Sequence, residues 1–309
     1  MTSFDKVGTA ITGISAIPVT PFDDRGEVDE DGLRTVLRRI EADVVVACGN
    51  TSEQFSLAAD EWERVSELTV EESGGTPVLV GVGGDLRTAA RQAARARELG
   101  AVGVMVHYPT QPLVSDAGLL DYYTRLADAT GGAVVPYVRG AGLSPAVLDG
   151  VAHLPSVVAI KYAVPDQMAF ADFAQRYGEA LVPVCGLAEM WAPFFWLAGA
   201  RGFTSGLVNV APKLSRAMLE ALREADYDRA MALWRIVAPF ERLRARHRNG
   251  NNVPVVKEAM ESLGLIASGA VRPPLSPLSR EDRAELERIL PALEPYLPKP
   301  AESPRMKNR

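Results

Sequence analysis

The sequence predicts an α/β protein, a (β/α)8 TIM barrel with a C-terminal helical appendage. Eight short β-type runs occur between residues 11 and 206, and segments with helix signals separate them. The runs are mostly apolar and rich in Val and Ile, which is typical of strands buried on both faces. A doubly wound open sheet is the alternative, but it has fewer strands and often a glycine-rich first turn, and the first turn here is PVTPFDD.

The elements follow one another at regular spacing. The predicted strands are residues 11–19, 43–48, 76–82, 101–106, 132–138, 156–161, 180–185 and 201–206, of which the last has the weakest pattern. Between them, Ser56, Asp85 and Ser144 are expected helix N-caps. Pro145 suits a first helical position, and Gly100 suits the position after a helix end.

Strand signals stop near residue 225. Residues 226–247, 253–264 and 279–293 have helical patterns, and the last helix is expected to begin with a capping box from Ser279 to Asp282. We therefore predict a barrel over residues 1–225 and a C-terminal helical region over 226–296. The polar, proline-rich residues 297–309 are predicted to be disordered.

Composition excludes several classes of function. A net charge of −6 argues against nucleic acid as a partner, and the arginine-rich residues 242–248 are interpreted as a solvated helix face. The two cysteines, Cys48 and Cys185, lack metal-ligand spacing. The amino terminus has no apolar signal-peptide core, and the apolar stretch 190–200 is too short to cross a bilayer. A reduced, cytoplasmic protein that contacts no membrane is expected.

Lys161 ends the apolar run AIKYA, where lysine is an unusual residue. In a TIM barrel the active site lies at the carboxyl ends of the strands. An amine shielded from water there has a lowered pKa and can attack a carbonyl carbon to form a Schiff base. The alternative is a non-catalytic lysine at the end of a strand, whose amine extends to solvent.

Other candidate site residues lie at the same strand ends. Tyr137 can transfer protons, and the turn GNTSE, with Gly49, Asn50 and Thr51, offers N–H groups for a carboxylate. The remaining candidate contacts with substrate are Arg139, Gly186, Phe203 and Ser205. Tyr137 alone could be a core residue, GNTSE a helix-capping turn, and His107 a packing residue. The histidines form no metal motif, so no metal site is predicted.

Taken together, these motifs resemble the dihydrodipicolinate synthase / N-acetylneuraminate lyase family of Schiff-base barrels. The resemblance runs from GISAIPVTPFDDRGEVDEDGL (13–33) through GNTSE, VPYVR (135–139), AIKYA and GFTSGLVNVAP (202–212) to VRPPLSPL (271–278). It implies that Lys161 forms the Schiff base and Tyr137 transfers protons. Asn50 and Thr51 would hold the substrate carboxylate. It also implies a homo-oligomer, a dimer or tetramer, and no cofactor.

Departures from the family pattern indicate a branch. Asn50 replaces a threonine of the proton relay, Pro109 a second tyrosine, and Gly142 an arginine that binds a second carboxylate, which disfavours dihydrodipicolinate synthesis. SEQFSL (52–57), YVR (137–139), HYPTQP (107–112) and VRPPL (271–275) are similar to the 5-dehydro-4-deoxyglucarate dehydratase branch. There, Arg139 would meet the distal carboxylate of a sugar acid.

Three functions therefore stay open. The first is dehydration and decarboxylation of a sugar acid through a Schiff base. The second is a pyruvate-dependent aldolase or a 4-hydroxy-tetrahydrodipicolinate synthase-like enzyme. The third is a barrel that binds a 2-oxo acid without turnover. All three take a small-molecule ligand.

Overall fold

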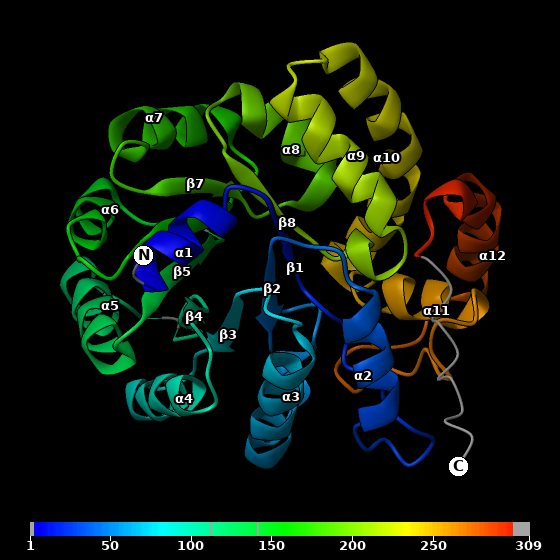
Figure 1. The fold of residues 1–309 in the computed structure, drawn as a ribbon, viewed down its shortest axis with the longest axis horizontal. Helices are drawn as coiled ribbons and strands as arrows, with labels where there is room; N and C mark the ends of the chain where they lie inside the picture. Colours follow the sequence, from blue (N-terminus) through cyan, green and yellow to red (C-terminus); the bar gives the residue numbers. More distant parts are fainter. Residues whose placement is uncertain (1–2, 112, 141, 299–309) are drawn as a thin grey trace, which may run out of the picture.

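Eight parallel strands close into a barrel in the computed structural model, which describes residues 3–111, 113–140 and 142–298 (Figure 1). Each strand pairs with the next along the chain, and the last pairs with the first. The strands are β1 (Ile14–Ala16), β2 (Val44–Ala47), β3 (Val78–Val82), β4 (Gly103–Val106), β5 (Ala133–Arg139), β6 (Ala159–Ala163), β7 (Val182–Cys185) and β8 (Gly202–Ser205). The predicted fold class is confirmed.

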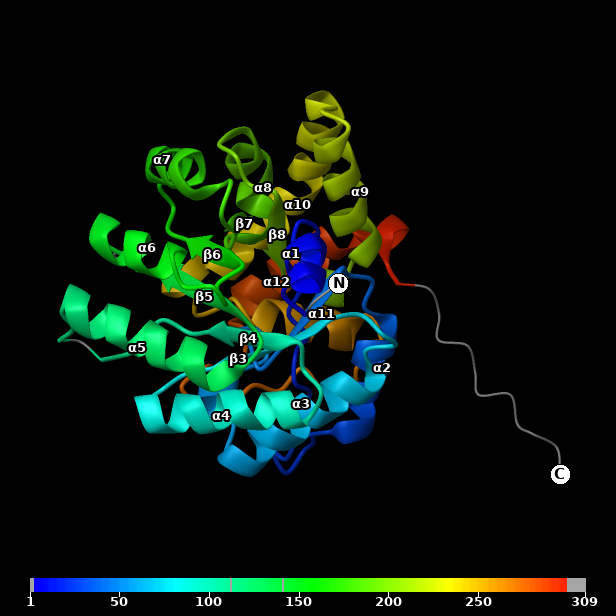
Figure 2. The same ribbon diagram turned by 60° about the vertical axis from the view of Figure 1, so that its left-hand side comes forward.

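Helices alternate with the strands and form a ring around them (Figures 1 and 2). Those of the ring are α2 (Glu30–Arg39), α3 (Ala59–Glu72), α4 (Leu86–Glu98), α5 (Asp116–Thr130), α6 (Pro145–Ala152), α7 (Gln167–Tyr177), α8 (Ala188–Leu197) and α9 (Pro212–Arg223). Four more helices are α1 (Ser3–Ala10), α10 (Tyr227–Asn249), α11 (Pro254–Ser262) and α12 (Arg280–Ile289). The short 3-10 helices are η1 (Gln54–Ser56), η2 (Leu207–Asn209), η3 (Leu290–Ala292) and η4 (Glu294–Tyr296).

Alternate residues of each strand belong to two separate apolar cores. Residues such as Val46, Met105 and Val135 fill the inside of the barrel. Their neighbours, such as Val45 and Val134, pack between the strands and the helices. This alternation follows from the pleat of a strand, and it decides which side chains face the barrel interior.

The helix α1 closes the end of the barrel where the strands begin. Its Val7, together with Ile11 just after the helix, is fully or almost fully buried and packs with inward residues of the strands. Figure 1 shows α1 lying across the ring of strands. Burying two such side chains contributes about 1.5–3 kcal/mol each. Only the opposite end, where the strands finish, is left for a site.

Most of the predicted helix boundaries are confirmed. Asp85 and Ser144 accept hydrogen bonds from Thr88 N–H and Val147 N–H, and Gly100 has φ +98°. The prediction for Ser56 is wrong, because Ser56 lies in η1 and α3 begins only at Ala59. There the Glu61 carboxylate accepts the Ala58 N–H at 2.8 Å, and no side chain caps the helix from the N-cap position.

The C-terminal helices extend the same apolar core as the barrel. Phe240, Val256 and Leu286 belong to one cluster with the outward residues of the strands. Ser279 caps α12 and accepts the Asp282 N–H at 3.1 Å, but the predicted capping box is incomplete. The Asp282 carboxylate pairs with Arg246, His247 and Asn251 instead of returning a bond to the Ser279 N–H. Whether residue 225 marks a domain boundary stays a prediction, and residues 299–309 of the predicted tail lie outside the described residues.

The interpretation of residues 242–248 as a solvated face is wrong for Arg244. Its side chain is 4% exposed, pairs with Glu241 at 2.6 Å and donates to Asn252. The backbone of α10 is not helical at Arg246, His247 and Arg248. The predicted helix over residues 226–247 therefore loses its helical geometry at residue 246. Within the described ranges, no helix is both long enough and apolar enough to span a membrane.

A fully buried ion pair ties α11 to the loop after β2. Lys257 Nζ lies 2.8 Å from Glu53 Oε1, and both side chains are 0% exposed. Glu53 Oε2 also accepts the Arg272 N–H at 3.0 Å. The Arg272 guanidinium in turn binds Glu61 in α3. Segments more than 200 residues apart in the chain therefore meet on one carboxylate.

We expect Lys257→Met to lower the free energy of unfolding by about 3–5 kcal/mol, because it leaves the Glu53 carboxylate buried without its cation. The double variant Glu53→Gln/Lys257→Met should recover much of this loss. Urea unfolding followed by circular dichroism measures both changes. Arg38→Met, at a pair whose arginine side chain is 63% exposed, is the control and should cost less than about 1 kcal/mol. Equal losses in Lys257→Met and the control would contradict the assignment.

Candidate active site

Lys161 points into the barrel from the middle of β6. Ala159, two residues earlier, belongs to the inner core, whereas Ile160 and Tyr162 pack toward the helices. Lys161 pairs in register with Tyr137 on β5 and with Val184 on β7. It is 3% exposed. The lysine is therefore part of the barrel interior and does not extend to solvent.

The Lys161 amine has few polar neighbours. Its Nζ lies 3.9 Å from Met105 Sδ and 4.0 Å from the centroid of the Tyr137 ring. Within the described part of the chain, no carboxylate pairs with it. Burial, assisted by the positive charge of Arg139, lowers its pKa to about 7. A large share of the amine is therefore uncharged at neutral pH and able to act as a nucleophile.

Tyr137 lies against this amine and is itself tied to the loop after β2. Its hydroxyl oxygen accepts a hydrogen bond from Asn50 Nδ2 at 3.3 Å. Burial is the main cause that raises the pKa of Tyr137, so the phenol keeps its proton at neutral pH. A protonated phenol beside an uncharged amine can pass a proton to and from a group that the amine attacks.

The loop Gly49–Glu53 has a backbone shape that suits an anion. A Cβ on Gly49 would lie 2.5 Å from Ile17 Cγ2, so only glycine allows this approach to β1. Ser52 Oγ accepts the Gly49 N–H and donates to Pro18 O, which fixes the turn. The N–H groups of Asn50 and Thr51 donate to no acceptor among the described residues. Two adjacent free N–H groups near an amine can hold a carboxylate.

Arg139 and Gly186 border the lysine in different ways. Arg139 is the exposed last residue of β5, two residues beyond Tyr137, at the open end of the barrel. Its charge is felt at Lys161, where it helps to lower the pKa. A Cβ on Gly186 would lie 3.0 Å from Lys161 Cγ and 2.8 Å from the Ala163 Cβ. The glycine therefore leaves room for the lysine side chain.

Phe203 and Ser205 do not join this cluster. Phe203 is 0% exposed in the core between strands and helices. Ser205 Oγ donates to Glu189 Oε1 and accepts the Val208 N–H. Both residues occupy outward positions of β8, and Thr204 between them takes the inward position. The sequence placed the strand end correctly, but the alternation along the strand turns these two side chains away from Lys161.

Two further residues lie near the cluster: His107, for which the sequence suggests a packing role, and Gln54, which it does not single out. His107 follows β4, is 2% exposed, and lies between the rings of Phe55 and Tyr137. Gln54, directly after GNTSE, is 9% exposed, and its Oε1 has no partner among the described residues. Alternate residues along β4 face the barrel interior, and His107 continues this series one residue past the strand end, which could have identified it. Gln54 follows a left-handed residue, Glu53, whose conformation no pattern predicts.

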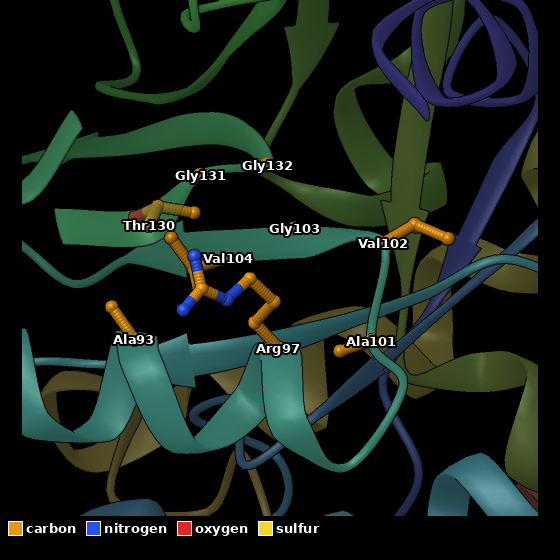
Figure 3. A pocket seen from close by; sticks show the side chains of 9 residues that line it. All are labelled: Ala93, Arg97, Ala101, Val102, Gly103, Val104, Thr130, Gly131 and Gly132. Carbon is orange, nitrogen blue, oxygen red and sulfur yellow. The ribbon is translucent and has the colours of Figure 1, made fainter. Parts of the chain in front are cut away.

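A separate cavity of about 240 Å³ lies between α4 and the start of β4 (Figure 3). The side chain of Arg97 reaches across it toward the turn Thr130–Gly132. This cavity is at the opposite end of the strands from Lys161, and its walls include no strong nucleophile. Across the described ranges, no group of three or more His, Cys, Asp or Glu side chains could hold a metal ion.

The chain is similar to known proteins over most of its length. Residues 10–293 match the model of the dihydrodipicolinate synthetase family. The chain is 28% identical over 305 residues to a probable 5-dehydro-4-deoxyglucarate dehydratase of Bacillus subtilis, covering 96% of this chain and 98% of that protein. It is 31% identical to a 4-hydroxy-tetrahydrodipicolinate synthase of Methanothrix thermoacetophila over 90% of this chain and 95% of the relative.

The solved structures show the same likeness. The crystal structure of dihydrodipicolinate synthase from Bacillus clausii superposes with a TM-score of 0.90 at 38% identity, covering 93% of this chain and 99% of that one. The structure from Oceanobacillus iheyensis gives a TM-score of 0.89 at 38% identity, over 94% and 99% of the two chains.

The lowered pKa predicts how Lys161 reacts with pH. Only the uncharged amine attacks a ketone, so the rate of borohydride-trapped adduct formation with a 2-oxo acid should rise as pH increases and level off above about 7. Peptide mass mapping locates the adduct, and Lys161→Ala is the control. A rate that keeps rising toward pH 10, as for an exposed lysine, would contradict the buried, unpaired amine.

Proposed function

The chain belongs to the dihydrodipicolinate synthetase family and is a lyase, and we propose that it dehydrates and decarboxylates a sugar acid resembling 5-dehydro-4-deoxyglucarate. The observation that carries the proposal is the buried Lys161 amine, which has no anionic partner and lies 4.0 Å from the Tyr137 ring. An uncharged amine in this position can attack the carbonyl carbon of a 2-oxo acid.

In the proposed reaction Lys161 attacks the ketone of the substrate, and water leaves to give a protonated imine. Tyr137 returns the proton that the carbinolamine oxygen needs to depart. The cationic imine then withdraws electrons, so a proton leaves the adjacent carbon and the next hydroxyl departs as water. The conjugated imine accepts the electron pair of the bond to the distal carboxylate, which leaves as CO₂. The resulting dienamine takes up a proton at the carbon next to the former imine carbon and becomes an imine again, while its enol end becomes an aldehyde. One water then hydrolyses the imine and frees Lys161.

Two anchors would orient a substrate with a carboxylate at each end. The free N–H groups of Asn50 and Thr51 suit the carboxylate next to the ketone. Arg139, at the open end of the barrel, suits the distal carboxylate because a guanidinium binds it with two parallel hydrogen bonds. This pairing supports a diacid substrate over pyruvate alone.

The alternative is a pyruvate-dependent aldolase or 4-hydroxy-tetrahydrodipicolinate synthase-like enzyme. The 38% identity to the dihydrodipicolinate synthase structure of Bacillus clausii favours it. Three residues oppose it, because Asn50, Pro109 and Gly142 replace the threonine, tyrosine and arginine of that family pattern. Gly142 has φ +81°, a conformation that disfavours any side chain at that position.

We also propose that the protein is a cytoplasmic homo-oligomer whose ligand is a small molecule. Its two cysteines are buried and unpaired, which suits a reducing compartment. Phe55 and Leu113, on loops after β2 and β4, are 60% and 88% exposed, which suits contact with another subunit. A barrel that binds a 2-oxo acid without turnover remains the third function, and ligand affinity unchanged in Lys161→Ala would indicate it.

We expect Arg139→Met to lower kcat/KM for 5-dehydro-4-deoxyglucarate about 10- to 100-fold, because a charge-assisted pair with the distal carboxylate is lost. Trapping of pyruvate on Lys161 should persist. Since Arg139 also lowers the Lys161 pKa, trapping is compared at about pH 9, where the amine is uncharged in both proteins.

The matched control is Arg91→Met, an exposed arginine on α4. Arg139→Lys keeps the charge without the bidentate geometry, so its activity should lie between the two. If sugar-acid turnover is unaffected while pyruvate condenses with an aldehyde, the aldolase alternative is correct.

A further inference from the structure

His107 and Gln54 form a polar wall beside the proposed imine position. The His107 ring stacks edge-on against Tyr137, with centroids 6.0 Å apart, and Tyr137 in turn lies against the Lys161 amine. A Cβ on Gly83 would touch His107 Cβ at 3.0 Å and lie 3.8 Å from Gln54 Nε2, so both side chains flank this one glycine. His107 therefore lies beside Tyr137, and Gln54 lies near His107 across Gly83.

The tautomer of His107 is determined by its surroundings. Its Nε2 lies 3.0 Å from the carbonyl oxygen of Cys48, which can only accept a hydrogen bond, so Nε2 carries the proton. Burial lowers the pKa of His107 to about 4, and the ring is uncharged at neutral pH. Nδ1 is then an acceptor, and no described residue donates to it.

Gln54 supplies a second acceptor of the same kind. Its side chain is more than nine-tenths buried, and Oε1 has no donor among the described residues. Asn50 Oδ1, next to the Tyr137 hydroxyl, is a third acceptor, and like Gln54 Oε1 it is a buried oxygen without a partner among the described residues. Buried acceptors without donors are costly unless a ligand satisfies them. A ligand that satisfies these acceptors must bring hydrogen-bond donors, and in a sugar acid those donors are its hydroxyl groups.

We propose that His107 Nδ1 and Gln54 Oε1 accept hydrogen bonds from the hydroxyl groups of a polyhydroxylated 2-oxo acid, and so select it over a deoxygenated acid of the same length. This inference rests on the proposed function, because it places the ligand ketone at Lys161. It differs from the role of Arg139, which recognises a carboxylate. A site built to bond hydroxyls rejects an analogue that lacks them, since its acceptors then stay unpaired.

A matched pair of ligands tests the proposal. 5-Dehydro-4-deoxyglucarate and 2-oxoadipate are six-carbon diacids with the same ketone, and only the first has hydroxyl groups. For each ligand, the concentration that half-saturates borohydride trapping on Lys161 within the first turnover is measured. We expect the unmodified protein to prefer the hydroxylated ligand by about tenfold or more.

His107→Gln separates the two contacts of the histidine, because glutamine can keep an N–H near Cys48 O but has nothing at the Nδ1 position. We expect the preference between the ligands to fall about tenfold, toward unity. His107→Asn keeps an oxygen near the Nδ1 position and should preserve more of the preference. Gln54→Met removes the second acceptor at similar volume and should lower the preference in the same direction.

The outcomes are distinct. If His107→Gln weakens trapping of both ligands equally, the ratio is unchanged, His107 only supports the loop through Cys48, and the inference is overturned. It is also overturned if the unmodified protein traps both ligands at equal concentrations, although the Schiff-base function then stands. If folded, unmodified protein traps neither ligand, the proposed function itself fails, and this inference fails with it.

Discussion

The ion pair between Glu53 and Lys257 is the contact on which the shape of the site depends. Glu53 has a left-handed backbone conformation, and its carboxylate is held by two groups, Lys257 Nζ and the Arg272 N–H, which together fix the turn that precedes it. Gly49, Asn50 and Thr51 lie in that turn. Taking both charges out of water is expensive, and burial accordingly lowers the pKa of Lys257 while the charge of Glu53 opposes this. The pair specifies one position for the loop relative to the C-terminal helices.

Two buried lysines, Lys161 and Lys257, show how the surroundings of a lysine determine its role. Lys257 has a carboxylate at 2.8 Å and acts as a structural cation. Lys161 has a thioether and an aromatic ring for neighbours, with a further positive charge nearby at Arg139. Burial disfavours the charged form in both cases, but only Lys161 lacks the compensation. The protein thus pairs one buried amine with a carboxylate and leaves the other unpaired and reactive.

The sequence predicted the barrel because the signals are local. Apolar runs, the cap residues Asp85 and Ser144, and Gly100 each depend on neighbours within a few positions. Contacts between distant segments could not be predicted, and Glu53 with Lys257, 204 residues apart, is the clearest example. Phe203 and Ser205 show a different limit. A strand end was located correctly, but inward and outward positions exchange with every residue, so the side to which a side chain points needs the observed register.

Because α1 fills the end of the barrel where the strands begin, the barrel interior opens only at the end where the strands finish. Everything that reaches or leaves Lys161 has to share that opening, past Arg139 and the Gly49–Glu53 turn. In the proposed reaction the small products, water and CO₂, can diffuse out around a ligand still attached to the lysine, whereas the remaining 2-oxo acid must detach first. Substrate binding and product release are therefore sequential, and a new substrate molecule cannot enter until the previous organic product has left.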